Sequence, residues 1–335
     1  MVDFAGWSMP VQYSSIIEEH NACRTAVGMF DVSHMGRFFF ADPSACEFLN
    51  GLTTRRVHPM DVGKIRYSLM TKDDGGVLDD VLVYHLADPS GRPFCFVVVN
   101  ASNRQKILDW LKQHGNLDQY GFEDRTTQTA MIAVQGPKAL DAMESLCSTA
   151  PGSLKYYHGM MTEVCGAAAI VSRTGYTGED GCELTVPADK ATEIWSAILE
   201  KAAPVGGGPV GLAARDTLRL EAAMPLYGHE LTEGINPAQA DVNFAINLKD
   251  REFPGRSAIV AARKDESLPK RIGLEMDGKR AAREHSLIYI GDDQVGEVTS
   301  GTFSPTFQKP IAMGFIKPEH TEPGTDVEID VRGKR

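Results

Sequence analysis

Two adjacent carboxylates, Asp79 and Asp80, are the first residues whose type and setting suit chemistry. They follow the turn signal Asp73-Asp74-Gly75-Gly76 and lie in an apolar, strand-like run at 77–84. Side chains alternate along a strand, so the two acids point to opposite faces, and Asp80 shares its face with Leu78, Leu82 and Tyr84. A carboxylate that lies against a core must be hydrogen-bonded or ion-paired, or its pKa must be raised. The segment therefore predicts either a functional acid in a cleft or a structural Asp that caps a turn.

A second group of interest is the glycine-rich, acidic segment 172–183, which contains Tyr176 and ends on Glu183. Glycines let backbone and an aromatic face approach a flat ring. A carboxylate such as Glu183 can accept two parallel N–H bonds from a guanidine-like edge. The segment is interpreted as a loop, and a solvated turn is the alternative to a binding loop.

Three further features have ordinary explanations. Arg215 and Arg219 lie four apart on the expected helix 212–223 and share a face. Taken alone, Arg215 fits a salt bridge better than a substrate ligand, and His34 fits a satisfied core histidine. The pattern G-x-G-x-x-G at 206–211 follows a helix rather than a strand, and Pro209 removes an amide that a phosphate would need. The segment 206–211 is therefore predicted to connect two helices.

Composition excludes several classes of protein. The chain has 335 residues, and 34 basic against 45 acidic side chains give a net charge of −11. A general nucleic-acid binder needs basic residues to neutralise phosphates. No apolar stretch approaches the roughly 20 residues of a membrane helix. We therefore expect neither nucleic acid nor a membrane as a partner.

The cysteines indicate neither a metal nor a disulfide framework. The six cysteines form no C-x-x-C pair, and no histidine cluster has ligand spacing. We expect no metal, no disulfides and a reducing compartment such as the cytoplasm. The first residues also lack the features of a signal or transit peptide, so a mitochondrial address is not readable.

The expected elements mix helices and strands without a regular β-α-β alternation, which favours an α+β fold with antiparallel sheets. Residues 1–265 form the mixed region. Residues 271–335 alternate in short runs separated by Gly and Pro, which predicts a small all-β domain. The expected helices are 14–27, 103–113, 138–147, 188–203 and 212–223, and the expected strands of the first region are 37–40, 66–70, 77–84 and 94–99.

Seven motifs, taken together and in this order, closely resemble the aminomethyltransferase (T protein) family of the glycine cleavage system. The resemblance covers nearly the whole chain. The motifs are FAGWSMPVQY at 4–13, FDVSHM at 30–35, GGVLDD at 75–80, RTGYTGEDG at 173–181, GLAARD at 211–216, LYGHEL at 226–231 and GEVTSG at 296–301.

The resemblance implies a cloverleaf of three domains around a central opening that holds tetrahydrofolate. Residues 1–265 would supply two interleaved α+β lobes, and 271–335 a C-terminal β-barrel or jelly-roll-like domain. It also implies the reaction. An aminomethyl group on the lipoyl arm of the partner H protein is transferred to tetrahydrofolate, which gives 5,10-methylenetetrahydrofolate, ammonia and the dihydrolipoyl arm. No cysteine of this chain needs to act as a nucleophile, and Cys182 is interpreted as packing.

The resemblance assigns roles to individual residues. Asp80, the second acid of GGVLDD, matches the catalytic aspartate. Glu183 matches the carboxylate that grips the pterin edge, and Arg215 matches a substrate-binding arginine. Further positions match residues that line the folate, namely Met35, Tyr67, Asn100 and Tyr176.

Some features depart from the family pattern. The stretch 236–244 lacks the acid and the tryptophan of many members, and the chain is expected to be shortened at both ends relative to them. Two alternatives remain. One is a tetrahydrofolate-dependent demethylase of the same fold. The other is a non-catalytic, folate-binding factor of iron–sulfur assembly, whose Lys-Gly-Cys-Tyr signature is absent here.

Overall fold

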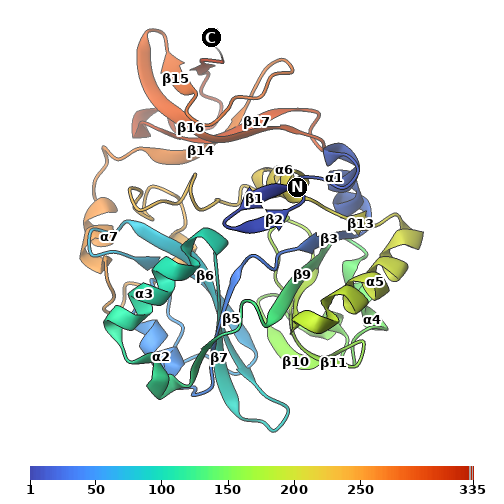
Figure 1. The fold of residues 1–335 in the computed structure, drawn as a ribbon. Helices are drawn as coiled ribbons and strands as arrows, with labels where there is room; N and C mark the ends of the chain where they lie inside the picture. Colours follow the sequence, from blue (N-terminus) through green and yellow to red (C-terminus); the bar gives the residue numbers. More distant parts are fainter. Residues whose placement is uncertain (332, 334) are drawn as a thin grey trace. The chain divides into compact units, whose positions relative to one another are not determined.

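A computed structural model describes residues 1–331, 333 and 335 of the chain (Figure 1). The contacts between residues divide the chain into two compact units. The first comprises Met1–Gly51, Arg55–Ser68 and Val81–Asp216, and the second comprises Leu52–Thr54, Leu69–Asp80 and Thr217–Arg335. The division at 265–271 expected from the sequence stays a prediction. Arg332 and Lys334, in the predicted all-β domain 271–335, lie outside the described residues.

The first unit contains a six-stranded sheet with the order β10-β11-β12-β9-β3-β13. Helices α4 (Ala139–Glu144) and α5 (Ala191–Ala202) cover it and share its hydrophobic core. All neighbouring strands are antiparallel except β13, which pairs with β3 in parallel. The strands are β3 (Gly28–Asp31), β9 (Thr129–Gln135), β10 (Gly159–Val164), β11 (Ala167–Ser172), β12 (Gly181–Pro187) and β13 (Gly208–Pro209).

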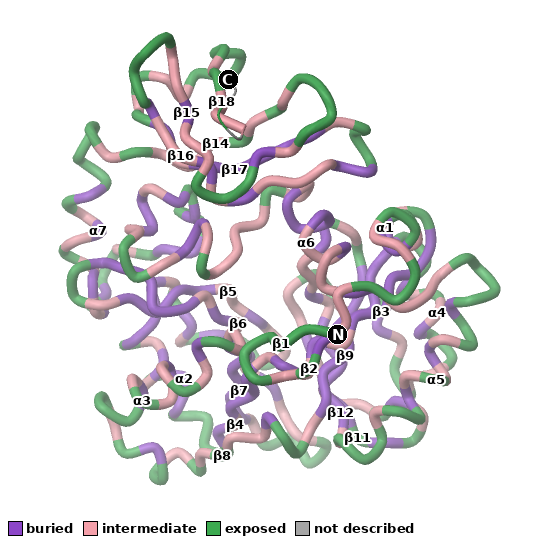
Figure 2. The backbone as a smooth tube through the Cα atoms, turned by 45° about the horizontal axis from the view of Figure 1, so that its top comes forward, coloured by how far each residue is buried: buried purple, intermediate pink, exposed green. Residues whose placement is uncertain are grey.

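A second sheet has the order β5-β6-β7-β4-β8. Most of its residues belong to the first unit, whereas the end of β5 and the start of β6 lie in Leu69–Asp80 of the second. Its central strands are almost entirely buried, as Figure 2 shows for β7. The strands are β4 (Gly36–Phe40), β5 (Lys64–Thr71), β6 (Val77–Ala87), β7 (Pro93–Val99) and β8 (Phe122–Asp124), and the helices that follow β4 and β7 are α2 (Ala45–Asn50) and α3 (Arg104–His114). A hairpin of β1 (Val2–Phe4) and β2 (Trp7–Met9) precedes these elements.

The second unit contains a five-stranded antiparallel sheet with the order β14-β17-β16-β15-β18. Its core is formed by apolar residues that include Ile288, Val298 and Ile316. The elements are α7 (Arg256–Ala262), β14 (Lys270–Glu275), β15 (Leu287–Ile290), β16 (Asp293–Ser304), β17 (Lys309–Ile316) and β18 (Glu328–Ile329). The mixed α+β fold with antiparallel sheets is therefore confirmed, and the C-terminal region expected to be all-β contains the strands β14 to β18.

Helix α1 (Ile16–Thr25) shows how local sequence fixes an element and then positions another. Ser15 caps the helix and accepts the N–H of Glu18 at 3.2 Å, as expected for a serine at this position. The Glu19 carboxylate is buried and accepts the N–H groups of Ser14 and Gly211, both at 2.7 Å. Gly211 immediately precedes α6 (Leu212–Glu221), so α1 fixes the start of the helix that carries Arg215.

The remaining regular elements are short 3₁₀ helices. One of them leads from α5 into 206–211, which connects α5 to α6 as expected but also contributes the two residues of β13. The 3₁₀ helices are Ala101–Asn103, Leu117–Tyr120, Pro151–Ser153, Ala188–Lys190, Ala203–Val205, Asn243–Ala245 and Pro318–His320.

Candidate functional site

Glu183 lies on a central strand rather than in a loop, which corrects the interpretation of 172–183. Strand β11 ends at Ser172 and β12 begins at Gly181, so only residues 173–180 form the loop. Glu183 pairs with Ser172 on one side and Ala133 of β9 on the other. The strand was not recognised because almost all of its residues are buried, and a strand buried on both faces shows no alternation of polar and apolar residues.

The loop 173–180 is held in place and is not a freely solvated turn. Arg173 and Asp180 form a two-pronged ion pair across its base. From α1, Arg24 donates to the Thr177 carbonyl at 2.7 Å and to Glu179 at 2.9 Å. Glu179 and Asp180 are therefore each paired with an arginine, although the Asp180 side chain is 44% exposed.

Gln135 at the end of β9 anchors the loop from beneath. Its amide nitrogen donates to the Thr174 carbonyl at 3.0 Å and to the Cys182 carbonyl at 3.3 Å. A Cβ at Gly175 would collide with the Gln135 amide, so only glycine allows this approach. Gln135 was not among the predicted site residues, because nothing local to β9 signals contacts with residues 39 and 47 positions further along the chain.

The Glu183 carboxylate is buried, with 7% of the residue exposed, and is bound by a single side chain. Thr174 donates to Oε2 at 2.5 Å, and Ser172 Oγ lies 2.8 Å from Thr174 Oγ1. Burial raises the pKa of Glu183 above its ordinary value, while Thr174 and the charge of Arg215 oppose that rise. Glu183 is therefore a buried carboxylate whose ionised form is stabilised by its neighbours.

Arg215 completes this cluster from α6. Its guanidinium carbon lies 4.9 Å from the centre of the Tyr176 ring and 5.9 Å from that of Phe30, within the range of cation–π attraction. Among the described residues it forms no ion pair, and its Nη1 has no hydrogen-bond partner. The salt bridge expected for Arg215 is therefore not present. Burial lowers the pKa of Arg215, and Glu183 acts against this.

His34 differs from the satisfied core histidine that the sequence suggested. The residue is 4% exposed and packs edge-on against Phe4, with ring centres 5.2 Å apart. Within the described part of the chain its Nδ1 has no hydrogen-bond partner. Burial, with a contribution from Arg215, lowers the pKa of His34 to about 4. The ring is therefore neutral at physiological pH.

Three of the other expected folate contacts lie on or next to the sheet β5-β6-β7-β4-β8, and all three are half-buried. Met35 and Asn100 directly flank the paired residues Gly36 of β4 and Val99 of β7, so they lie side by side at one end of these strands. The Met35 carbonyl accepts from the buried Arg37 at 2.7 Å, which fixes the backbone there. Tyr67 lies on β5.

Asp80 is half-buried on β6, whereas Asp79 is fully buried. The turn before them is tightly packed within the second unit. A Cβ at Gly76 would collide with the Glu233 carbonyl, and the Val77 N–H donates to the Thr232 carbonyl at 3.0 Å. The turn residues thus fix where β6 begins and, with it, the two acids.

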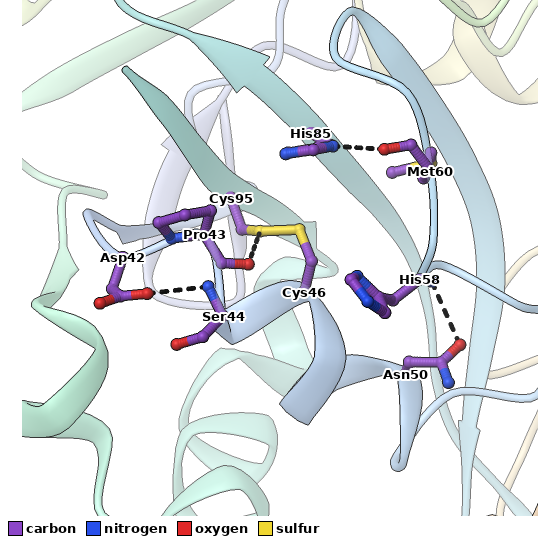
Figure 3. Close-up of a disulfide and its surroundings, with 9 residues drawn as sticks. All are labelled: Asp42, Pro43, Ser44, Cys46, Asn50, His58, Met60, His85 and Cys95. Carbon is purple, nitrogen blue, oxygen red and sulfur yellow. Dashed lines mark hydrogen bonds between the residues drawn. A yellow bond between two sulfur atoms is a disulfide. The ribbon is translucent and has the colours of Figure 1, made fainter.

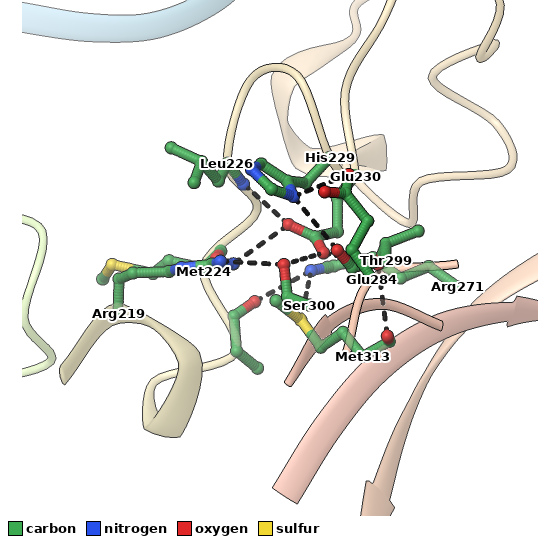
Figure 4. A network of polar contacts seen from close by, with 11 residues as sticks. Arg219, Met224, Leu226, His229, Glu230, Arg271, Glu284, Thr299, Ser300 and Met313 are labelled. Atoms are coloured by element: carbon green, nitrogen blue, oxygen red, sulfur yellow. Dashed lines mark hydrogen bonds and ion pairs between the residues drawn. The ribbon is translucent and has the colours of Figure 1, made fainter. Parts of the chain in front are cut away.

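A buried ion pair organises the second unit (Figure 4). Arg219 donates to Glu230 Oε2 at 3.0 Å and to Ser300 of β16 at 2.8 Å. Ser300 in turn donates to Glu230 Oε1 at 2.6 Å. The charges of Arg219 and Glu230 therefore compensate each other. The network links Glu230 of the LYGHEL segment to Ser300 of the GEVTSG segment, and its role is structural.

A disulfide joins Cys46 of α2 to Cys95 of β7 (Figure 3), with Cα atoms 6.0 Å apart. The expectation that the chain has no disulfides is therefore wrong for this pair. The two cysteines are 49 positions apart and only the packing of α2 against β7 brings them together. Cys182 is fully buried, and burial raises the pKa of its thiol, in line with a packing role.

Among the described residues, no group of three or more His, Cys, Asp and Glu side chains is placed to hold a metal ion. No helix in residues 1–331 has both the length and the apolar character that crossing a membrane requires.

The fold and the cluster around Glu183 can now be compared with known proteins. Residues 1–250 match the family model described as GCVT N-terminal domain, and residues 270–335 match the one described as Glycine cleavage T-protein C-terminal barrel domain. The chain therefore belongs to the glycine cleavage T-protein family. It is an aminomethyltransferase of the glycine cleavage system.

Individual relatives support this assignment along the whole chain. An aminomethyltransferase of Chloroherpeton thalassium is 44% identical over 100% of this chain and 91% of the relative. That of Streptomyces avermitilis is 43% identical over 99% and 90%. The crystal structure of the glycine cleavage system aminomethyltransferase T from Bartonella henselae matches with a TM-score of 0.89 at 29% identity, covering 99% of this chain and 90% of that one. The resemblance inferred from the seven motifs is confirmed.

Proposed function

We propose that this chain transfers the aminomethyl group from the lipoyl arm of H protein to tetrahydrofolate. The carbon loses its bonds to the lipoyl sulfur and to the amino nitrogen and gains bonds to N5 and N10 of the folate. Two protons from the folate nitrogens go to the sulfur and the departing ammonia. The products are 5,10-methylenetetrahydrofolate, ammonia and the dihydrolipoyl arm.

The observation that carries the folate part of the proposal is the Glu183 cluster. A buried carboxylate with one bound side chain can accept paired N–H bonds from the pterin edge. Arg215 beside Tyr176 offers a cation and an aromatic face to the same ligand. We propose Glu183 and Arg215 as folate-binding residues, together with Met35, Tyr67, Asn100 and Tyr176.

Asp80 is the proposed catalytic residue. A carboxylate on a largely apolar strand can hydrogen-bond a folate nitrogen, move a proton while N5 attacks the aminomethyl carbon, and stabilise the cationic iminium character that develops. Its half-buried position is compatible with contact to a substrate. The fully buried Asp79 has a structural role.

The central folate-holding opening, the lipoylated H protein as partner and a cytoplasmic location belong to the proposal as well. The decisive experiment measures ammonia release from aminomethylated H protein with and without tetrahydrofolate. We expect strong acceleration by the folate. No acceleration would contradict the proposal, and methyl transfer from a small methylated substrate without H protein would favour the demethylase instead.

A further inference from the structure

The side chains behind Glu183 form a continuous chain of buried hydroxyls. Thr174 Oγ1 contacts Glu183 Oε2 at 2.5 Å, and Ser172 Oγ contacts Thr174 Oγ1 at 2.8 Å. Ser172 and Thr174 are each 2% exposed. Water therefore does not compete for these hydroxyls.

The number of protons fixes the direction of this chain. A hydroxyl has one proton, and that of Thr174 is used on Glu183. Ser172 must then be the donor in its 2.8 Å contact with Thr174, which is shorter than its 3.4 Å contact with the Glu183 carbonyl. Both O–H dipoles thus point toward the carboxylate, and hydrogen bonds to an ionised acceptor are the strongest kind.

The same arrangement leaves the second carboxylate oxygen available. No described residue donates to Glu183 Oε1, and Thr174 occupies one of the two acceptor positions of Oε2. An ionised carboxylate in this state can accept two parallel N–H bonds from a flat ligand edge. A protonated Glu183 would instead present an O–H that opposes one of those donors.

We propose that Thr174, supported by Ser172, is a positioning residue that holds Glu183 as an oriented, ionised carboxylate for the pterin edge of the folate. The inference takes its ligand, tetrahydrofolate, from the proposed function. The effect of Thr174 on Glu183 does not require that ligand. The two parts can therefore be tested separately.

The first test measures the pKa of Glu183 without folate, by ¹³C NMR of protein labelled at glutamate carboxyls and assigned with Glu183→Gln. Thr174→Val keeps the shape of the side chain but removes its donor. Because that hydrogen bond favours the ionised form, we expect the pKa of Glu183 to rise by about one unit or more. Thr174→Ser should restore it. An unchanged pKa in Thr174→Val would overturn the inference.

The second test measures the affinity for tetrahydrofolate under argon across pH 5 to 8. Loss of a hydrogen bond to a charged group predicts binding that is about tenfold to a hundredfold weaker in Thr174→Val. Affinity falls as Glu183 becomes protonated, so the fall should begin at higher pH in this variant than in the wild type. Weaker binding without this shift would indicate only a structural role and would overturn the inference.

Controls keep the result interpretable. Thr162→Val changes a threonine of β10 in the same sheet and should shift neither the pKa nor the affinity. If Thr174→Val does not fold, Ser172→Ala removes the second link and should shift the pKa of Glu183 in the same direction by less. If wild-type protein does not bind tetrahydrofolate, the proposed function fails, and the NMR experiment still decides the role of Thr174.

Discussion

Arg219 and Glu230 form an ion pair 3.0 Å long in which both side chains are at most 2% exposed. Each charge depends on the other, because an isolated charge in the interior is costly. Arg219→Met should therefore lower the free energy of unfolding by about 3–5 kcal/mol. Denaturant unfolding measures this. Lys309→Met, which breaks the exposed pair of Lys309 with Glu275, is the control and should cost at most about 1 kcal/mol.

Asp80→Asn should reduce the rate of ammonia release on the order of a hundredfold or more while the protein stays folded. Asparagine keeps the size of the side chain but cannot take a proton or stabilise a cation as a carboxylate does. Asp73→Asn, in the exposed turn before β6, is the control and should leave the rate unchanged. Near-normal turnover in Asp80→Asn would refute the catalytic role.

Glu183→Gln should raise the KM for tetrahydrofolate by about tenfold to a hundredfold, because two charge-assisted bonds to the ligand are replaced by weaker or mismatched ones. The effect should be smaller on kcat than on KM if Glu183 binds rather than reacts. Steady-state kinetics separates the two. Glu163→Gln, which changes the exposed residue of β10 in the same sheet, should change neither constant.

His34 should make the protein less stable as the pH falls. Its pKa is about 4 in the folded state and about 6.5 when unfolded, so between these values the unfolded chain binds the extra proton. The part of the free energy of unfolding that depends on a neutral His34 is fully present above pH 6.5 and is lost as the pH falls toward 4. Urea unfolding should show a loss of about 2 kcal/mol between pH 7 and pH 5 that His34→Gln lacks. The exposed His114→Gln should retain the wild-type dependence, and equal slopes in all three proteins would contradict the prediction.

The disulfide predicts a thiol count and a redox-dependent stability. Four of the six cysteines are free, so four thiols should react in denatured, unreduced protein and six after reduction. Opening a loop of 49 positions should lower the free energy of unfolding by about 3–4 kcal/mol. A Cys46→Ala, Cys95→Ala variant should be equally destabilised and insensitive to reductant. Six reactive thiols without reduction would contradict the pair.

Much of the fold was readable because its signals are local. The cap and acids of α1, the β-branched runs of β6 and β7 and the alternation of β15 to β17 each indicate an element within a few residues. The strands β9, β11 and β12 were missed for the opposite reason. They are rich in apolar residues and mostly buried, and without a polar face a strand has no period to detect.

The sequence by itself determined the family, the antiparallel α+β fold and the residue types that a folate enzyme needs, because motifs and element periodicity are written in adjacent residues. Only the tertiary structure decided how those residues are used. It brought Thr174 to Glu183 and Cys46 to Cys95, left His34 Nδ1 without a hydrogen-bond partner among the described residues and gave the ion pair to Arg219 rather than Arg215. Each of these outcomes depends on strands and helices that are distant in the chain but adjacent in the fold. The hydrogen bonds, burial and ionisation of a side chain are set by its neighbours in space.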